Sequence, residues 1–327
     1  MNKRERLERT IAGETADRPP IALWRLFPGD DQRAADLARS TIEFQRTYDW
    51  DFARISPSIT YCTSDYGLHD EWEGAIDGER TIKKRAITRS LDWTVLRPLD
   101  PQRGGYGKQL ECIELIYRQL GEEVPILATI FSPLAQAEAL CGPELFSLHL
   151  RKEPDRLRSA LNVLTENILR YVEMLRRLPI AGAAYVIRHA SYHRLSEDEY
   201  AAFGLPFDIK VLDSLPSKWW FNMVSLECPS PIFKFAMHLR GQAINWADRE
   251  NEPDLAIGKT LHSGAVCGGL SNREDLYHGT PTTVREAVRS ALEKTSERRI
   301  IIGAGFPLNI ATPLSNIRAA RQAVEGL

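Results

Sequence analysis

Near the end of the chain, the spacing of apolar positions changes from helical to strand-like and back. Between Thr280 and Lys294, apolar residues recur at steps of three and four, which predicts an amphipathic helix, and Thr280 followed by Pro281 is a typical helix start. The apolar run from Arg299 to Phe306 predicts a strand buried on both faces, and a final helix is expected from Pro313. A buried strand between two helices indicates a parallel sheet covered by helices.

The same alternation runs through the rest of the sequence. Helices are expected at Ala34–Tyr48, Lys108–Leu120 and Pro154–Arg177, and another from Ser196. Strands are expected at Asp51–Ser56, Val124–Phe131 and Ile180–Ile187, and the alternation continues at Trp220–Leu226 and Ile232–Phe235. Because no GxGxxG motif follows an early strand, the pattern favours an α/β fold with a single closed (β/α)8 barrel, one domain spanning residues 1–327, over a doubly wound sheet.

Composition narrows the class of protein. The chain has 327 residues, of which 43% are hydrophobic and 26% charged, as expected of a soluble globular protein. Its formal charge of −2 gives no support to nucleic-acid or membrane-surface binding. No apolar run approaches the roughly 20 residues that span a bilayer, and the first nine residues are charged rather than signal-like, so a cytoplasmic protein is expected.

The five cysteines are scattered and odd in number, and none forms a CxxC pair: Cys62, Cys112, Cys141, Cys228 and Cys267. Neither a disulfide framework nor a zinc knuckle is indicated. Most are expected to be buried thiols. Cys267 precedes a Gly-Gly turn and would line the barrel mouth, although no base for a nucleophilic cysteine is evident.

Motifs at both ends of the chain resemble those of one superfamily. Residues 4–14 (RERLERTIAGE) and 17–25 (DRPPIALWR) resemble the opening of uroporphyrinogen decarboxylases, in which a short helix and a DRPPV turn lead to a cleft strand ending in arginine. Gly268-Gly269-Leu270 resembles the family's GNLDP turn. Residues 303–307, with Thr312-Pro313 and Asn316, resemble its closing GHGI...TP..N motif.

Two motifs between these ends also resemble the family. Residues 180–183 resemble AGAD, and residues 195–200 resemble LSPEDF, so the resemblance spans nearly the whole chain. It implies the TIM-type barrel of uroporphyrinogen decarboxylases. It also implies a homodimer and cofactor-free decarboxylation of a tetrapyrrole or a related acidic substrate.

The positions that carry decarboxylase activity are altered. Arg25 matches the first arginine of the family's RQAGR motif, which binds substrate carboxylates, but residues 26–29 replace the remainder. The family's essential aspartate falls on Ser58, whose neutral hydroxyl cannot replace its charge, and Asp65 is a candidate substitute. The histidine of GHG is Ala304. These changes argue against ordinary uroporphyrinogen decarboxylation.

The other branch of the superfamily comprises corrinoid-linked methyltransferases, which hold zinc with an HxC on one strand and a cysteine in a closing GCG. His238 matches the histidine, but Arg240 and Ala304 stand in place of the cysteines, so no metal is expected from this motif. The alternative is a rebuilt zinc site from His189, His193 and His238, with a corrinoid protein as partner. A simple rim histidine pair is the more common arrangement, and it leaves His189 as a candidate acid or base.

Arginines and tryptophans supply the candidate substrate contacts. Arg25, Arg188 and Arg240 are expected near the carboxyl ends of strands, where they would bind a carboxylate or phosphate. A flat apolar wall for a tetrapyrrole or aryl ligand would come from Trp24, Trp219, Trp220 and Trp246. The predicted catalytic residues are His189, His238 and Asp65. The predicted substrate-binding residues are Arg25, Ser58, Arg240, Trp24 and Trp246.

The resemblance to the family, together with the altered motif residues, leaves three possible functions. The first is a decarboxylase-like enzyme without a cofactor, in which arginines orient acidic groups and a histidine supplies a proton. The second is a methyltransferase or demethylase that passes a methyl group between a small methylated compound and a corrinoid protein. The third is a barrel that only binds a tetrapyrrole or another acidic ligand.

Overall fold

Seven parallel strands form the centre of the computed structural model, which describes residues 1–325. The strands are β1 (Ala53–Arg54), β4 (Ile126–Phe131), β5 (Gly182–Ile187), β6 (Met223–Leu226), β7 (Ala243–Trp246), β8 (Ala265–Leu270) and β9 (Ile300–Ala304). Each pairs in parallel with the next, in the order β1-β4-β5-β6-β7-β8-β9. All are buried along their length, because helices cover the outer face and side chains fill the inner one.

The segment that follows the DRPP turn closes this sheet into a barrel. Ile21 pairs in parallel with Ile302 of β9, and the backbone nitrogen of Ala22 donates to the Ile302 carbonyl over 3.1 Å. On the other side, the nitrogen of Asp51, just before β1, donates to the Ile21 carbonyl over 3.0 Å. The segment therefore supplies the eighth position of a (β/α)8 barrel, as the sequence predicted.

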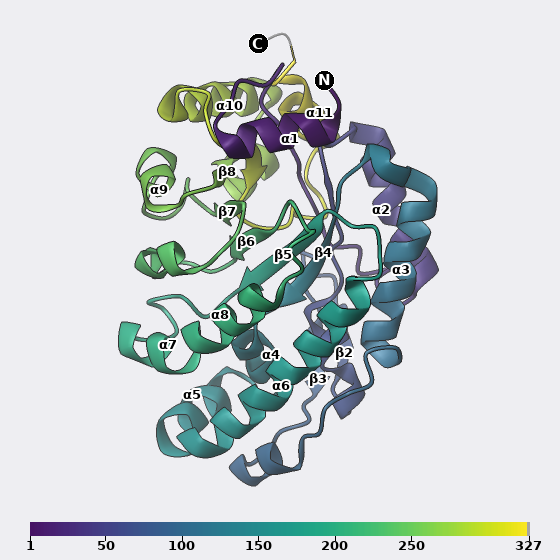
Figure 1. The fold of residues 1–327 in the computed structure, drawn as a ribbon, viewed down its shortest axis with the longest axis vertical. Helices are drawn as coiled ribbons and strands as arrows, with labels where there is room; N and C mark the ends of the chain where they lie inside the picture. Colours follow the sequence, from purple (N-terminus) through teal and green to yellow (C-terminus); the bar gives the residue numbers. More distant parts are fainter. Residues whose placement is uncertain (326–327) are drawn as a thin grey trace.

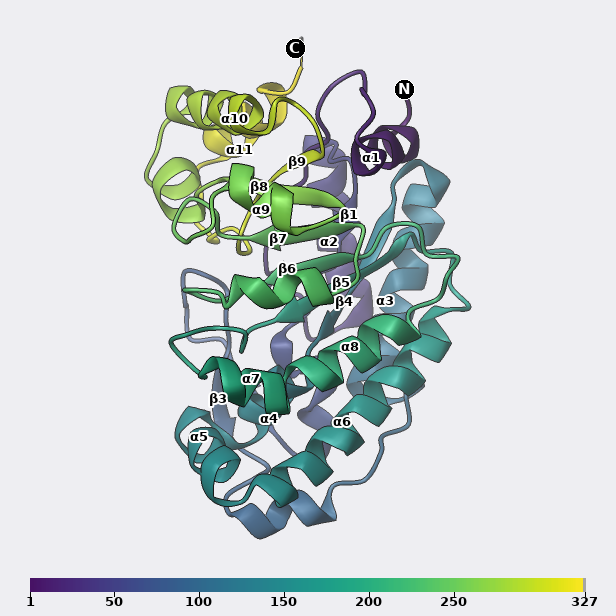
Figure 2. The ribbon, with the colours of Figure 1, turned by 60° about the vertical axis from the view of Figure 1, so that its left-hand side comes forward.

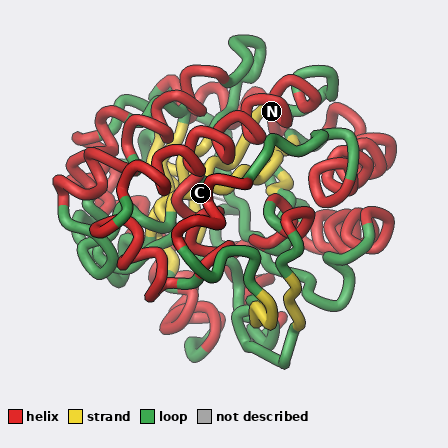
Figure 3. The backbone as a smooth tube through the Cα atoms, turned by 90° about the horizontal axis from the view of Figure 1, so that it is seen from below, coloured by secondary structure: helices red, strands yellow, loops and turns green. Residues whose placement is uncertain are grey.

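Helices surround the strands, as Figures 1, 2 and 3 show. The α-helices are α1 (Lys3–Ala12), α2 (Ala34–Tyr48), α3 (Gly104–Leu120), α4 (Pro133–Cys141), α5 (Pro143–Lys152), α6 (Pro154–Leu175), α7 (Glu197–Phe203), α8 (Leu205–Ser214), α9 (Leu255–Leu261), α10 (Pro281–Thr295) and α11 (Leu314–Gln322). Shorter helical turns are η1 (Ile59–Cys62), η2 (Ser64–Tyr66), η3 (Ser90–Val95), η4 (Gly121–Glu123), η5 (Phe233–His238) and η6 (Asn272–Tyr277). Among residues 1–325, no helix is both long and apolar enough to cross a membrane.

The two ends of the barrel are covered differently. At the amino ends of the strands lies α1: the guanidinium of Arg4 lies 5.2 Å from the Trp220 ring, and Arg298 donates to the Gly13 carbonyl over 3.0 Å. At the carboxyl ends lies an antiparallel hairpin, β2 (His69–Glu71) and β3 (Thr81–Lys84), with the connecting loop 72–80. Figure 1 shows α1 and this hairpin on opposite sides of the sheet.

Most predicted elements are confirmed, and the errors lie in one region. The predicted helix 34–48 matches α2, and Thr280 caps α10 by accepting from the Thr283 nitrogen over 3.3 Å. Ile232–Phe235, however, coincides mainly with the helical turn η5, and the strands β7 and β8 were not predicted. Gly268-Gly269-Leu270, which resembles a family turn, forms the end of β8.

Candidate functional site

A layer of polar side chains fills the inside of the barrel. Ser225 of β6 donates to Asn245 of β7 over 2.7 Å, and the Asn245 amide nitrogen donates to the carbonyls of Cys267 and Ala304 over 2.9 and 3.0 Å. Burial raises the pKa of the Cys267 thiol to about 12, so this cysteine is a neutral thiol inside the barrel. The bonds tie four neighbouring strands, β6 to β9, together, and burial leaves the Cys267 thiol without nucleophilic character.

An ion pair between Arg54 and Glu227 crosses the barrel at the carboxyl ends of the strands. Arg54 is the last residue of β1, Glu227 follows β6, and their side chains meet at 2.6 Å with exposed fractions of 3% and 2%. The Arg54 guanidinium also lies 4.7 Å from the centre of the Trp24 ring. Burial of either charge alone would be costly, so each group requires the other.

A second arginine joins this pair. Arg188 follows β5 and contacts Glu79 of loop 72–80 at 2.5 Å and Glu227 at 3.7 Å. Its guanidinium lies 5.6 Å from the centre of the Phe131 ring. Its Nε is buried and has no hydrogen-bond partner within residues 1–325. The mouth therefore contains two arginines, two glutamates and an arginine Nε–H without an acceptor.

A small cavity lies between these charges. It is lined by residues including Arg54, Ser56, Glu79, Arg188 and Glu227, and its volume is about 10 Å³. That volume is roughly enough for one water molecule. The mouth of the barrel is therefore closed by the hairpin loop and its ion pair.

The hairpin is held at the base of its loop. Arg80 contacts Asp70 at 2.7 Å and Asp31 at 3.1 Å, and the nitrogen of Ile310 donates to the Ile76 carbonyl over 2.7 Å. Burial raises the pKa of Asp31 to about 6 despite the nearby Arg80. Glu79 thus lies between two attachment points, at Ile76 and Arg80.

Three of the predicted residues lie near the mouth. The Trp24 side chain is inside the barrel against Arg54. Ser58 is buried and caps η1 by accepting from the Thr60 nitrogen over 3.3 Å. Asp65 is exposed and accepts from the Gly105 nitrogen at the start of α3 over 2.9 Å, a capping contact rather than a position in the cavity.

Arg25 and Trp246 face away from the cavity. Arg25 lies 5.4 Å from the Phe27 ring, and burial lowers the pKa of its guanidinium. Because side chains alternate along extended backbone, Trp24 points inward and Arg25 outward. Trp246 packs on Phe233, with ring centres 4.7 Å apart, and donates to the Pro253 carbonyl over 2.8 Å. The expectation of a flat tryptophan wall was wrong, because Trp246 packs outside the barrel and Trp220 lies at its amino end.

His189 also turns away from the cavity. Its Nε2 lies 3.0 Å from Glu138 of α4, and its ring packs against Phe146 of α5. Burial lowers the pKa of His189 and, with the smaller effects of Arg194 and Arg188, outweighs the opposing effect of Glu138, so a neutral imidazole is expected at pH 7. His193 is exposed and lies 3.1 Å from the Ser230 hydroxyl.

His238 and Arg240 lie at the wrong end of the barrel for the predicted roles. Both precede β7, which begins at Ala243, so they lie at the amino ends of the strands. Arg240 is 83% exposed and contacts Asp213 at 3.3 Å. The placement of Arg240 at a carboxyl end was therefore wrong. His238 terminates a helical turn rather than a strand, so it does not occupy the strand position of an HxC zinc motif.

The donor set does not fit zinc. Within the described chain, no three His, Cys, Asp or Glu side chains are arranged to hold a metal ion. At the carboxyl end of β6, the inward side chains are Ser225 and Glu227, and Glu227 is already paired with the cation of Arg54. A second cation there would be repelled by the guanidinium.

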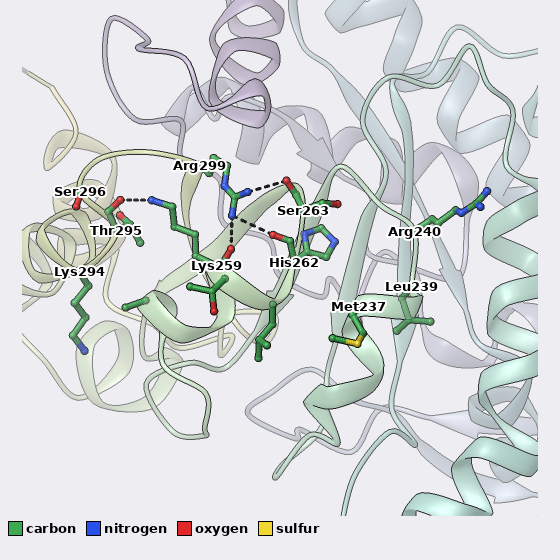
Figure 4. A pocket seen from close by; sticks show the side chains of 13 residues that line it. Met237, Leu239, Arg240, Lys259, His262, Ser263, Lys294, Thr295, Ser296 and Arg299 are labelled. Carbon is green, nitrogen blue, oxygen red and sulfur yellow. Dashed lines mark hydrogen bonds between the residues drawn. The ribbon is translucent and has the colours of Figure 1, made fainter.

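A much roomier cavity lies at the amino end, lined in part by Arg240. Its volume is about 750 Å³, and Figure 4 shows its lining, which contains arginine and lysine side chains. Arg299 donates to the carbonyls of Ser263 and His262 over 2.9 and 3.1 Å, and Lys259 donates to the Thr295 carbonyl over 2.5 Å. These cations donate to backbone carbonyls and so hold the loops at the amino end in place. They serve a structural role, and we do not assign a reactive site to this cavity from its size.

Sequence reasoning missed Arg54, Glu79 and Glu227. Arg54 is the one charged residue between Phe52 and Ile55 in a predicted strand, and Glu227 directly follows another. A charge at the carboxyl end of a buried strand was the available signal. Nothing in the sequence marks Glu79, because its hairpin reaches the mouth only through the fold.

The fold and site place the protein among (β/α)8 barrels whose polar site lies at the carboxyl ends of the strands. The chain belongs to the uroporphyrinogen decarboxylase (URO-D) family, whose model matches residues 2–327. This confirms the resemblance seen in the sequence.

The chain is similar to two methyltransferases. It is 19% identical to a methylcobamide:CoM methyltransferase MtbA of Methanosarcina acetivorans, over 89% of this chain and 88% of the relative. It is 19% identical to the MtbA of Methanosarcina mazei, over 96% and 95% of the two chains. These relatives agree with the methyltransferase alternative and give no support to the decarboxylase.

Two solved structures share the fold. A methyltransferase from Methanosarcina mazei superposes with a TM-score of 0.87 over 99% of this chain and 98% of that chain, at 18% identity. A B12-independent methionine synthase from a Shewanella species gives a TM-score of 0.61 at 11% identity, over 96% of each chain. At these identities the likeness concerns the fold.

Proposed function

We propose that the protein transfers a methyl group between a small anionic substrate, bound at the carboxyl end of the barrel, and a corrinoid carried by a partner protein. Nearly end-to-end similarity to two methylcobamide:CoM methyltransferases supports the reaction class. The observation that carries the site is the pair of inward arginines, Arg54 and Arg188, which meet at Glu227. Guanidinium groups bind carboxylates and sulfonates through paired hydrogen bonds.

Each residue at the mouth has a definable task in this reaction. Arg188 binds the anionic group of the substrate, and Glu227 holds Arg54 in place beside it. The rings of Trp24 and Phe131 back the two guanidiniums and favour an apolar substrate body. A corrinoid supplies or accepts the methyl group as a CH3⁺ equivalent. The side chains orient the substrate and exclude water, so that its reacting atom faces the open end of the barrel.

The cofactor-free decarboxylase is the weaker candidate. The two arginines would also suit a substrate carboxylate, but the cavity of about 10 Å³ would have to enlarge far more for a tetrapyrrole than for a small organic acid. No histidine lines that cavity, since His189 faces α4 and His238 lies at the other end of the barrel. The histidine that would supply the proton in this reaction is therefore missing from the lining of the cavity.

The first test is a methyl-transfer assay on the purified protein. Methylcobalamin is mixed with CoM as the reference acceptor, and then with a panel of small thiols that carry a carboxylate or sulfonate. Loss of methylcobalamin absorbance that depends on both protein and acceptor is the expected result. No demethylation with any acceptor, together with release of CO2 from uroporphyrinogen, would overturn the proposal in favour of the decarboxylase.

A further inference from the structure

The ion pair between Arg188 and Glu79 lies across the mouth of the barrel, where both residues line the small cavity. We propose that Arg188 binds the carboxylate or sulfonate of the substrate, that Glu79 is a built-in competitor for this arginine, and that the substrate anion displaces Glu79 and opens loop 72–80. The reaction that follows rests on the proposed methyl transfer, whereas the anion exchange itself does not.

The hydrogen bonding of Arg188 is incomplete in this closed state. Glu79 accepts only from Nη2, over 2.5 Å, while the neighbouring Nε is buried without a partner in the described chain. A buried donor without an acceptor costs free energy. Nε and Nη2 form one edge of the guanidinium plane, and a carboxylate or sulfonate binds such an edge with two parallel bonds. A substrate anion would therefore satisfy both donors, which Glu79 does not.

The balance of charges makes Glu79 the replaceable group. Arg54 and Arg188 carry two positive charges, and Glu227 and Glu79 carry two negative charges. Glu227 is 2% exposed and contacts both arginines, so its charge is fixed in the barrel. Glu79 is 33% exposed and comes from a surface loop. A single incoming negative charge restores neutrality when Glu79 leaves, which favours substrates with one anionic group at this end.

The small volume of the cavity also requires Glu79 to leave before a substrate can bind. With Glu79 in place, the cavity of about 10 Å³ holds nothing larger than a water molecule. Arg80 fixes one side of Glu79 through Asp31 and Asp70, and the Ile310-to-Ile76 hydrogen bond fixes the other. Opening the loop therefore breaks the Ile76 contact first, because that side has a single backbone bond and Arg80 has two carboxylate partners.

The apolar part of the cavity wall completes the description of the ligand. Leu26, Ile59 and Pro307 line the same cavity as the charges. The ligand class is thus a small organic acid with one carboxylate or sulfonate and a short apolar body.

The exchange is tested by anion binding to Glu79→Gln. Acetate and methanesulfonate are titrated into the full-length protein, and the dissociation constant is taken from the shift in denaturant midpoint with anion concentration. Removing the competing charge is expected to tighten binding about 5- to 10-fold. Glu73→Gln is the matched control, because Glu73 lies in the same loop but pairs with Lys83. Binding to Glu79→Gln that equals or is weaker than binding to Glu73→Gln would overturn the proposal.

Loop opening has its own readout. Hydrogen exchange at the Ile310 amide, which bonds to the Ile76 carbonyl, is expected to speed up when the anion binds to wild type, and to be already fast in Glu79→Gln. Unchanged exchange in both would contradict displacement. Because neither experiment uses a corrinoid, anion exchange without methyl transfer would refute only the proposed reaction, and methyl transfer without anion exchange only this inference.

Discussion

The two ends of this barrel contrast in how they use charge. At the carboxyl end, a cavity of about 10 Å³ lies among the buried Arg54, the half-buried Arg188 and two glutamates, and the Arg188 Nε–H has no acceptor in the described residues. The amino end has a cavity of about 750 Å³, where Arg299 and Lys259 donate hydrogen bonds to backbone carbonyls. The comparison is the basis for proposing the ligand site from the charges gathered at the carboxyl end rather than from empty volume.

The largest expected effect at the mouth concerns the buried pair. Arg54→Met leaves Glu227 buried without its main partner and is expected to lower the free energy of unfolding by roughly 3 to 5 kcal/mol. Urea unfolding measures the loss. The double variant Arg54→Met with Glu227→Gln should recover a large part of it, and a double variant as unstable as the single one would show that the pair is not the cause.

At the amino end, pH provides the sharper test. Burial, with the nearby Arg299, lowers the pKa of His262 to about 4. The folded pKa lies below the unfolded value of about 6.5, so protonation of His262 favours the unfolded chain. The free energy of unfolding is therefore at its full value above pH 6.5 and decreases by up to about 3 kcal/mol as the pH falls toward 4. His262→Asn keeps an acceptor for the Gly264 nitrogen and should flatten the unfolding free energy between pH 6.5 and 4. An unchanged slope would exclude His262 as its source.

Arg299→Met is expected to have a smaller effect on stability and none on binding at the mouth. The variant loses the hydrogen bonds to the carbonyls of Lys259, Ser263 and His262, which should cost about 1 to 3 kcal/mol. Thermal or urea unfolding gives the cost, and methanesulfonate titration tests binding. Weaker anion binding in this variant would place an anion site at the amino end and contradict the contrast drawn between the two ends.

The smallest effect is expected at Trp24. Trp24→Phe keeps an aromatic ring near Arg54, and the indole nitrogen that is lost has no hydrogen-bond partner in the described residues. A decrease of roughly 0.5 to 1 kcal/mol in the free energy of unfolding is expected from the weaker cation–π contact. A decrease above about 3 kcal/mol would mean that the indole has a structural role beyond this contact.

The sequence predicted the fold better than the site, for a physical reason. Buried strands such as β4 and capped helices such as α10 are local patterns, and they were predicted near their observed positions. The site instead depends on contacts between distant residues: Arg54 and Glu227 are 173 positions apart. His238 was misplaced because a three-residue motif does not reveal which end of a strand it adjoins, and β7, next to it, was not predicted.

The central claim is that methyl transfer takes place at the carboxyl end, and a matched pair of arginine variants tests it directly. Arg188→Met and Arg299→Met remove the same charge from opposite ends of the barrel. In the methylcobalamin assay, at a temperature where both variants are folded, Arg188→Met is expected to lower kcat/KM at least about 100-fold and Arg299→Met less than about 2-fold. Equal losses, or a larger loss in Arg299→Met, would contradict the account.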